Sequence, residues 1–313
     1  MRYFVTSDMH SFYTPFIEAL DSAGYDKNDP EHTLIICGDV FDRGYGSADL
    51  FEFLSDIDPQ RLILIKGNHE ELYIDLLKKY YPEEHDFHNG TVNTFCQLAR
   101  ITEYEGMSIE YYLRMNSRSL NGNCYGVTDP CYGTFDKNKE AIDLWHKIYQ
   151  KVLNHPATKW ITSDAWKDYY ELDRFIFVHS FIPVEKPKGL EVYNADWYSG
   201  AFKYFKNWRA DATEDDWSAA RWGCPWKQYD AGLFDEEKKK DKVLVCGHWH
   251  TYDFYKHLDH DDTLMRYESP IYAGSNIIGL DACTAYNDNV NVLVIDNDRL
   301  YDKFGKEIAL KKE

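Results

Sequence analysis

The sequence predicts an α/β fold with a largely parallel sheet at its N-terminal end, and three observations support this. Short apolar runs alternate with helical segments over residues 3–80, which is the rhythm of βαβ units. These runs are continuously apolar, as expected of strands buried on both faces. Similar runs return after residue 165. Parallel strands joined in this way are expected to have right-handed crossovers.

Three strands and three helices account for the first part of the chain. The strands are predicted at residues 3–5, 34–37 and 62–65. The helices are predicted at residues 14–23, 48–57 and 70–80. Thr14 is a suitable N-cap for the first helix, and Pro15 fits its first helical position. The order of these elements is therefore βαβαβα.

The alternation breaks between residues 81 and 161, where the segments are helical or irregular. The clearest helix covers residues 139–153, where apolar side chains recur at helical spacing and are expected to pack in the core. These side chains are Ile142, Trp145, Ile148, Tyr149 and Val152. We interpret residues 81–161 as a helical insertion or cap.

Strands return in the last part of the chain. They are predicted at residues 166–172, 174–178, 243–246, 277–280 and 292–295. The first two should form a hairpin that turns near Asp173, and the last two should be antiparallel. Residues 183–241 are rich in Trp and Tyr and are interpreted as a second insertion. We expect one domain over residues 1–313 that contains both insertions.

Composition and charge disfavour several classes of protein. The chain is 44% hydrophobic and 16% aromatic, which argues for a packed core and against disorder. Its formal net charge of −18 disfavours binding to nucleic acid and to anionic membranes. No apolar run has the length of a membrane span.

The seven cysteines are scattered, and no signal peptide is recognised, so we expect reduced thiols in the cytoplasm. Cys37 and Cys246 are expected to be buried strand residues, and Cys124 and Cys131 are expected to be ordinary core or surface residues. The sequence does not indicate an oligomeric state.

Five short polar segments follow the apolar runs, at the points where strands should end. They read DMH at 8–10, GDVFDRG at 38–44, GNHE at 67–70, VHS at 178–180 and GHWH at 247–250. Each of them supplies Asp, Asn or His. Because the carboxyl ends of parallel strands converge in space, these side chains are expected to meet in one site.

The donor atoms of these segments suit metal ions that prefer oxygen and nitrogen ligands. Carboxylates and imidazoles without thiolates favour Mn, Fe or Zn. Two ions about 3.5–4 Å apart can clamp the attacking and leaving oxygens of an in-line displacement and can supply hydroxide near neutral pH. One carboxylate must bridge such ions, and Asp39 is the natural candidate. The pattern predicts a binuclear site that attacks a phosphate ester.

The order DxH, GDxxDRG, GNHE, a lone strand-end His and GHxH resembles the calcineurin-like metallophosphoesterases. The second and third segments resemble the phosphoprotein phosphatase branch in particular, with its bacterial and phage-type serine/threonine phosphatases and diadenosine tetraphosphatase-like members. The resemblance covers the strand ends but not the two insertions. It implies a four-layer α/β/β/α sandwich of two mixed sheets.

The resemblance also implies seven ligands for two divalent or trivalent metal ions, with Mn preferred and Fe or Zn as alternatives. The first ion would be held by Asp8, His10 and His250. The second ion would be held by Asn68, His179 and His248. Asp39 would bridge the two ions.

Further residues of the same segments would perform the chemistry. His69 would protonate the leaving oxygen, oriented by Asp42, which would keep the imidazole protonated near neutral pH. Arg43 would bind the phosphate oxygens through its planar donors, and Asn68 would also face the substrate. A simpler alternative is that Asp42 and Arg43 pair with each other at a turn. Glu70 is expected to support the start of its helix.

The sequence departs from the phosphoprotein phosphatases at several places. The fourth segment continues as HSF instead of HGG, the fifth reads GHWH instead of GHT, and no arginine follows closely after GNHE. A further phosphate-binding arginine usually lies between the fourth and fifth segments. Arg221 is the candidate here, and the alternative that Arg221 stacks on a neighbouring tryptophan is equally open.

These features predict a phosphatase that hydrolyses phosphate monoesters, such as phosphoserine or phosphothreonine, by attack of a metal-activated hydroxide. The alternative is a hydrolase with the same site that cleaves a dinucleoside polyphosphate or another nucleotide. A scaffold that has lost catalysis is a third interpretation. It is disfavoured because all the ligands and His69 are present.

Overall fold

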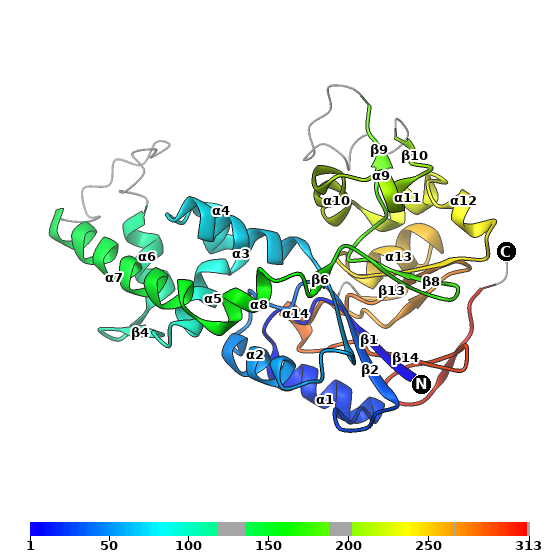
Figure 1. Ribbon diagram of the computed structural model, residues 1–313, viewed down its shortest axis with the longest axis horizontal. Coiled ribbons are helices and arrows are strands. Elements are labelled where there is room, and N and C mark those ends of the chain that lie inside the picture. Colours follow the sequence, from blue (N-terminus) through cyan, green and yellow to red (C-terminus); the bar gives the residue numbers. More distant parts are fainter. Residues whose placement is uncertain (118–134, 188–201, 266, 312–313) are drawn as a thin grey trace.

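Two sheets form the centre of the computed structural model, which describes residues 1–117, 135–187, 202–265 and 267–311 (Figure 1). The first sheet has the order β16-β15-β14-β1-β2-β3-β6. Its strands are β1 (Arg2–Thr6), β2 (His32–Cys37), β3 (Leu62–Ile65), β6 (Trp166–Lys167), β14 (Leu293–Asp296), β15 (Arg299–Tyr301) and β16 (Glu307–Ile308). Strands β1, β2, β3 and β6 are parallel, and β14 to β16 continue the sheet in antiparallel fashion.

The second sheet has the order β12-β13-β11-β8-β7. Its strands are β7 (Tyr170–Leu172), β8 (Phe175–Phe177), β11 (Val243–Cys246), β12 (Tyr272–Ala273) and β13 (Ile277–Gly279). Strands β8, β11 and β13 are parallel, whereas β7 and β12 are antiparallel edge strands. Both sheets are therefore mixed, as predicted.

The side chains of each central strand divide between two hydrophobic clusters, which defines the layers. In β2, Ile35 and Cys37 pack between the sheets against Phe177 and Val245 of the second sheet, while Ile36 packs on the outer face. The two hydrophobic clusters on the outer faces contain side chains of the strands together with side chains of the helices of each half. This alternation, which follows from the two-residue period of a strand, produces the predicted four-layer α/β/β/α sandwich.

Helices cover the outer faces of both sheets. The helices of the first half are α1 (Tyr13–Ala23), α2 (Ser47–Ser55) and α3 (Asn68–Lys79). Those of the second half are α9 (Trp208–Asp211), α10 (Glu214–Arg221), α11 (Pro225–Asp230), α12 (Asp235–Lys238), α13 (Thr251–Leu258) and α14 (Thr284–Asn287). Helix α3 begins earlier than predicted, so that Asn68 and His69 lie in its first turn.

The first insertion extends away from the sheets (Figure 1). It contains α4 (Glu84–Asn89), α5 (Thr91–Leu98), α6 (Ile109–Ser117), α7 (Phe135–Leu153), α8 (Pro156–Ile161), β4 (Glu103–Tyr104) and β5 (Met107–Ser108). Besides the expected helices, the insertion contains a small hairpin formed by β4 and β5. Its turn uses positive φ at Glu105 and Gly106.

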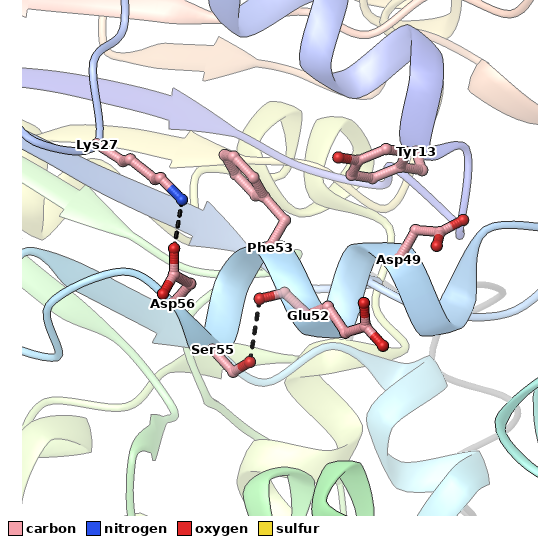
Figure 2. A pocket seen from close by; sticks show the side chains of 7 residues that line it. All are labelled: Tyr13, Lys27, Asp49, Glu52, Phe53, Ser55 and Asp56. Atoms are coloured by element: carbon pink, nitrogen blue, oxygen red, sulfur yellow. Dashed lines mark hydrogen bonds and ion pairs between the residues drawn. The ribbon is translucent and has the colours of Figure 1, made fainter.

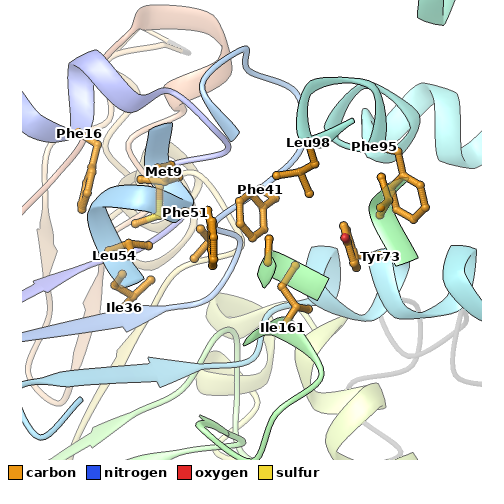
Figure 3. Close-up of a cluster of buried hydrophobic side chains, with 14 of the residues drawn as sticks. Met9, Phe16, Ile36, Phe41, Phe51, Leu54, Tyr73, Phe95, Leu98 and Ile161 are labelled. Carbon is orange, nitrogen blue, oxygen red and sulfur yellow. The ribbon is translucent and has the colours of Figure 1, made fainter. Parts of the chain in front are cut away.

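One hydrophobic cluster joins the insertion to the first sheet. Figure 3 shows Phe41, Tyr73 and Phe95 of α5 following one another in this cluster. The ring centroids of Phe41 and Tyr73 are 6.5 Å apart, and those of Tyr73 and Phe95 are 4.8 Å apart. Trp145 and Ile148 of α7 are buried in the same cluster, which confirms that the stripe of α7 is core packing. The division of the chain into one domain with two insertions stays a prediction, since parts of both insertions lie outside the described residues.

Two predicted strand arrangements were wrong. The first strand of the predicted hairpin is split, because β6 pairs with β3 in the first sheet while β7 pairs with β8 in the second. The hairpin turn at Asp173, with a φ of 48°, was predicted correctly. The prediction of antiparallel tail strands was wrong in part: β14 lies antiparallel to β1, as predicted, whereas β13 lies parallel to β11 and antiparallel only to β12. Such pairings between distant segments leave no local pattern in the sequence.

The second insertion is less irregular than its composition suggested. It contains α9 to α12 and a two-stranded sheet of β9 (Val184–Glu185) and β10 (Lys203–Tyr204). Cys37 and Cys246 are fully buried, as predicted, while Cys124 and Cys131 lie outside the described residues. Within the described residues, none of the helices combines the length and apolar character that crossing a membrane requires.

Candidate metal centre and active site

The five polar segments follow the carboxyl ends of β1, β2, β3, β8 and β11. Within each sheet these five strands are parallel to one another, so each sheet directs its segments to one edge. The two edges meet, since Oδ1 of Asp39 from the first sheet lies 3.4 Å from Nε2 of His179 from the second. The packed sheets therefore bring residues from both halves of the chain into one site.

Asp39 lies at the centre of this site. Its carboxylate belongs to two candidate ligand groups, one with His10 and His69 and one with His179 and His248. Within each group the candidate ligand atoms all lie within 4.8 Å of one another. Oδ2 of Asp39 is 3.7 Å from Nε2 of His10, whereas Oδ1 faces His179. The two oxygens of one carboxylate thus face two separate groups, as a bridging ligand would.

The remaining predicted ligands lie around these two groups. Oδ1 of Asn68 is 2.8 Å from Nε2 of His179, inside the second group. The buried carboxylate of Asp8 accepts the backbone N–H of His248 at 3.0 Å and the hydroxyl of Ser7. His250 is half-buried and belongs to neither group among the described residues. Asp8 is thus linked to the second group through the backbone of His248, whereas the structure places His250 outside both groups.

Burial determines the charge of these groups. Burial raises the pKa values of Asp39 and Asp8 well above their usual range, and the nearby carboxylate of Asp281 raises that of Asp8 further. Burial also lowers the pKa of His10, and it lowers the pKa of His179 to about 3. Burial thus favours the neutral imidazoles that can act as ligands, and the carboxylates lack the positive charge nearby that would favour their ionised form. This donor set fits divalent metal ions, which need neutral imidazoles and would supply the missing charge.

The loops that carry the site adopt strained backbone conformations. Positive φ values between 47° and 76° occur at six of the predicted site residues, Asp8, His10, Asp39, Asp42, Arg43 and His248. A side chain on Gly67 would overlap Oδ1 of Asp39. Left-handed non-glycine residues cost free energy and cluster at functional sites. The glycine of GNHE is thus needed because the backbone approaches the central carboxylate closely.

His69 and Asp42 form a buried pair. Nδ1 of His69 lies 2.8 Å from Oδ2 of Asp42, and Nε2 points toward Oδ2 of Asp39 at 3.9 Å. Arg43 is exposed, with Nη2 3.4 Å from Nε2 of His69. Burial lowers the pKa of His69 although Asp42 opposes the shift. Desolvation and the Asp42 carboxylate thus act in opposite directions on this pKa, and the role of Asp42 in keeping the imidazole protonated stays a prediction.

Several supporting residues were missed in the sequence. Both oxygens of Asp42 accept hydroxyl protons, Oδ2 from Thr91 at 2.8 Å and Oδ1 from Thr94 at 2.7 Å. These contacts, together with His69, occupy the carboxylate that was alternatively expected to pair with Arg43. The two threonines belong to α5 of the insertion, where no motif marks them. Only the three-dimensional contacts identify these threonines as supporting residues of Asp42.

Glu70 does more than support the start of α3. Its buried carboxylate accepts backbone N–H groups from Gly67 at 2.8 Å and from Asp39 and Val40 at 3.0 Å each. Burial raises its pKa to about 7, while these three bonds oppose the shift. Asp281 was also missed, although it follows the apolar residues 277–280 as the polar segments follow other strands. Its position at the end of an apolar run could therefore have identified Asp281 as a candidate site residue.

Arg221 is buried among carboxylates. Its Nε donates to Glu71 at 2.6 Å, Nη1 to Asp168 at 2.8 Å and Nη2 to Glu214 at 2.5 Å. Trp222 donates from Nε1 to the same Glu71 at 3.1 Å. All three guanidinium nitrogens are thus engaged. This placement does not support the predicted contact of Arg221 with phosphate.

A separate open cleft of about 450 Å³ lies beside α1 and α2 (Figure 2). Carboxylates, Lys27 and two aromatic rings line it, and Lys27 pairs with Asp56. None of the predicted site residues is among its lining residues. The cleft is therefore distinct from the metal centre.

The family model of calcineurin-like phosphoesterases matches residues 1–171. Two curated proteins of Candida albicans are similar over part of the chain. Serine/threonine-protein phosphatase PP2A-like PPG1 is 27% identical over 150 residues, which are 46% of this chain and 33% of that protein. Serine/threonine-protein phosphatase SIT4 is 34% identical over 83 residues, which are 25% of this chain and 26% of that protein. The chain thus spans at most about a third of the length of these relatives.

Among solved structures, a cold-active protein-tyrosine phosphatase of a psychrophilic Shewanella species is 15% identical. The superposition covers 99% of this chain and 80% of that chain, with a TM-score of 0.46.

Proposed function

This chain belongs to the calcineurin-like phosphoesterases, and we propose that it hydrolyses phosphate monoesters with the help of two metal ions. One observation carries the proposal: the two oxygens of Asp39 face two separate histidine groups, with the His69–Asp42 pair beside them. A bridging carboxylate next to a positioned acid is the arrangement that metal-assisted phosphoryl hydrolysis requires.

Each residue of the site has a proposed role. His10 and Asp39 would hold the first ion together with Asp8 and His250, and Asn68, His179 and His248 would hold the second with the shared Asp39. When bound, the ions supply positive charge and lower the pKa of water, so that hydroxide is available near neutral pH. Manganese is our first choice, with iron or zinc as alternatives, because the donors are carboxylate, amide and imidazole.

The proton of the leaving oxygen is proposed to come from Nε2 of His69. Asp42 holds Nδ1, so Nε2 is the nitrogen free to face the substrate. Burial lowers the pKa of His69, and an anionic phosphate beside it would favour the protonated form again. Arg43 is exposed next to Nε2 and is proposed to bind phosphate oxygens with its planar donors.

The first substrate class we propose is a phosphoserine or phosphothreonine side chain. This choice of substrate class is based on the two Candida albicans relatives, which are named as serine/threonine-protein phosphatases. We also propose that the protein works in the cytoplasm. Cys37, Cys96 and Cys246 are buried free thiols, which fit a reducing compartment.

Removal of metal tests this function directly. Chelated protein is expected to lose hydrolysis of a phosphoserine peptide by at least about a hundredfold, and added Mn²⁺ should restore it. Metal content measured in parallel should approach two ions per chain. In Asp39→Asn both ions should bind weakly, because both groups share this carboxylate. Full activity of the metal-free protein would contradict the proposal.

A nucleotide hydrolase is the second candidate function, and an aromatic pair next to the site favours it. The ring of Tyr286 is 64% exposed and lies 6.2 Å from the ring of His250. It stacks on Tyr267 with centroids 5.3 Å apart and an interplanar angle of 17°. Asn287 donates to the carbonyl groups of Tyr267 and Ala282 and so ties the two loops together. An exposed, held aromatic face can stack on a nucleobase.

Tyr286→Ala is therefore expected to raise KM for diadenosine tetraphosphate about tenfold, the value of one lost base stack. KM for a phosphoserine peptide should not change, since the peptide offers no base. Tyr111→Ala removes an equally exposed tyrosine from α6 and serves as the control. Unchanged steady-state constants for the dinucleotide in Tyr286→Ala would rule out this stacking role.

A further inference from the structure

The carboxylate of Asp42 is held by the helical insertion. Thr91 donates to Oδ2 at 2.8 Å, and Thr94 donates to Oδ1 at 2.7 Å. The hydroxyl of Thr94 also accepts the backbone N–H of Asp42 at 3.1 Å, which closes a small ring. Asp42 and both threonines are fully buried. These contacts fix both the position and the rotation of the carboxylate.

Helix α5 and the residue before it contact the loop after Asp42 at several points. Gln97 donates to the carbonyl of Gly44 at 2.8 Å and accepts the N–H of Ser47 at 2.9 Å. Gly90, just before α5, has a φ of 89°, and a side chain there would overlap the backbone nitrogen of Arg43. The insertion thus binds this loop by polar contacts and by close backbone packing.

This anchoring determines where His69 points. Oδ2 of Asp42 accepts from Thr91 and also faces Nδ1 of His69 at 2.8 Å. Rotation of the carboxylate would break its bonds to the threonines as well as its contact with the imidazole. The first turn of α5, whose dipole favours an anion, lies against the same carboxylate and offsets the burial of its charge. The insertion therefore acts on His69 through Asp42.

We propose that Thr91 and Thr94 are positioning residues for proton donation by His69, and that the insertion serves the reaction through them. This inference rests on the proposed hydrolysis of phosphate esters. It assigns a role to residues outside the five polar segments. Neither threonine touches a predicted metal ligand in the described contacts, so metal binding should not depend on them.

The leaving group of the substrate distinguishes this role from a merely structural one. Benzyl phosphate releases a basic alkoxide, which needs a proton as the P–O bond breaks. p-Nitrophenyl phosphate releases a weakly basic phenolate, which leaves without one. In both reactions water supplies the new P–O bond, and only the first needs the proton of His69. Damage to the fold or to the metal site would slow both substrates equally.

Thr94→Val is expected to lower kcat for benzyl phosphate about tenfold, the value of one hydrogen bond to a charged group. Its kcat for p-nitrophenyl phosphate, both KM values and the metal content should stay unchanged. Thr94→Ser restores the hydroxyl and should restore kcat. Thr158→Val removes a buried hydroxyl of α8 that contacts Tyr73 instead of Asp42, and it is the matched control.

The outcomes separate the two proposals. An equal loss on both substrates, or no loss on either, would overturn the positioning role while leaving hydrolysis intact. A metal-loaded wild type that cleaves neither ester would refute the proposed function and this inference with it. A leaving-group-dependent loss that Thr94→Ser reverses would support both. A double Thr91→Val, Thr94→Val variant should show a larger loss on benzyl phosphate alone.

Discussion

His69→Ala is expected to lower kcat for an alkyl phosphate by about 10²–10⁴-fold while both metal ions stay bound. The imidazole is almost fully buried, with Nδ1 engaged by Asp42 and Nε2 directed toward Asp39. A general acid in this place contributes only when the leaving oxygen takes up a proton. Its removal should therefore reduce the rate of the chemical step and leave the binding of phosphate nearly unchanged.

Metal content is the decisive second measurement for this variant. His69 also lies in one candidate ligand group with His10 and Asp39, so the geometry allows it to be a ligand. A proton donor can be removed without loss of metal, whereas removal of a ligand should release the first ion. A loss of about one ion per chain in His69→Ala would contradict the role of proton donor.

A second buried histidine provides the control. His32 of β2 packs against Phe4 and Tyr25 and accepts the N–H of Asp26 at 3.1 Å, away from the metal centre. His32→Ala should lower thermal stability by an amount similar to His69→Ala. Its kcat should equal that of the wild type. A similar loss of kcat in both variants would show that the effect of His69 is structural.

The strand ends could be predicted because their signal is local. An apolar run followed by Asp or His marks both a buried strand and its carboxyl end, and parallel pairing then brings such ends together. This reasoning placed His10, Asp39, His179 and His248 in one predicted site, and the structure gathers them around Asp39. Asp281 carries the same signal, but it was missed because no familiar motif accompanies it.

The supporting contacts could not be predicted because they depend on distant pairs. Thr94 lies 52 residues from Asp42, in an insertion with no pattern shared with the polar segments. Arg221 lies 150 residues from Glu71, and its neighbours in sequence do not reveal that three carboxylates surround it. The type of residue at a motif position limits its chemistry, whereas a hydrogen bond between an insertion and the rest of the chain depends on how the whole chain packs.

Arg221→Met is expected to lower the free energy of unfolding by about 3 kcal/mol, within the range for a broken buried ion pair. The guanidinium is only 2% exposed and donates to Glu71, Asp168 and Glu214. Its removal leaves three carboxylates facing one another. Asp168 and Glu214 can recover water because they are 33% and 63% exposed, so the loss should not reach the upper end of the range. Denaturant unfolding with a common slope measures it.

A double-mutant cycle distinguishes this structural role of the Arg221 ion pairs from the predicted contact of Arg221 with phosphate. If Arg221 and Glu71 stabilise each other, Arg221→Met combined with Glu71→Gln should cost less than the sum of the single changes, by about 0.5–3 kcal/mol. A phosphate ligand would show no such coupling. Instead, Arg221→Met would raise KM about tenfold with little change in stability, and that result would restore the original assignment.

Arg209 provides a matched control, because it forms a second set of ion pairs with carboxylates. It donates to both oxygens of Glu237 at 2.9 and 3.0 Å and to Glu171, and none of these residues is a predicted ligand. Arg209→Met should therefore destabilise the fold to a similar degree and leave kcat unchanged. Arg221 differs in that Glu71 belongs to the first turn of α3, next to Asn68 and His69. Loss of its guanidinium should thus lower kcat as well as stability, because α3 carries both residues to the metal centre.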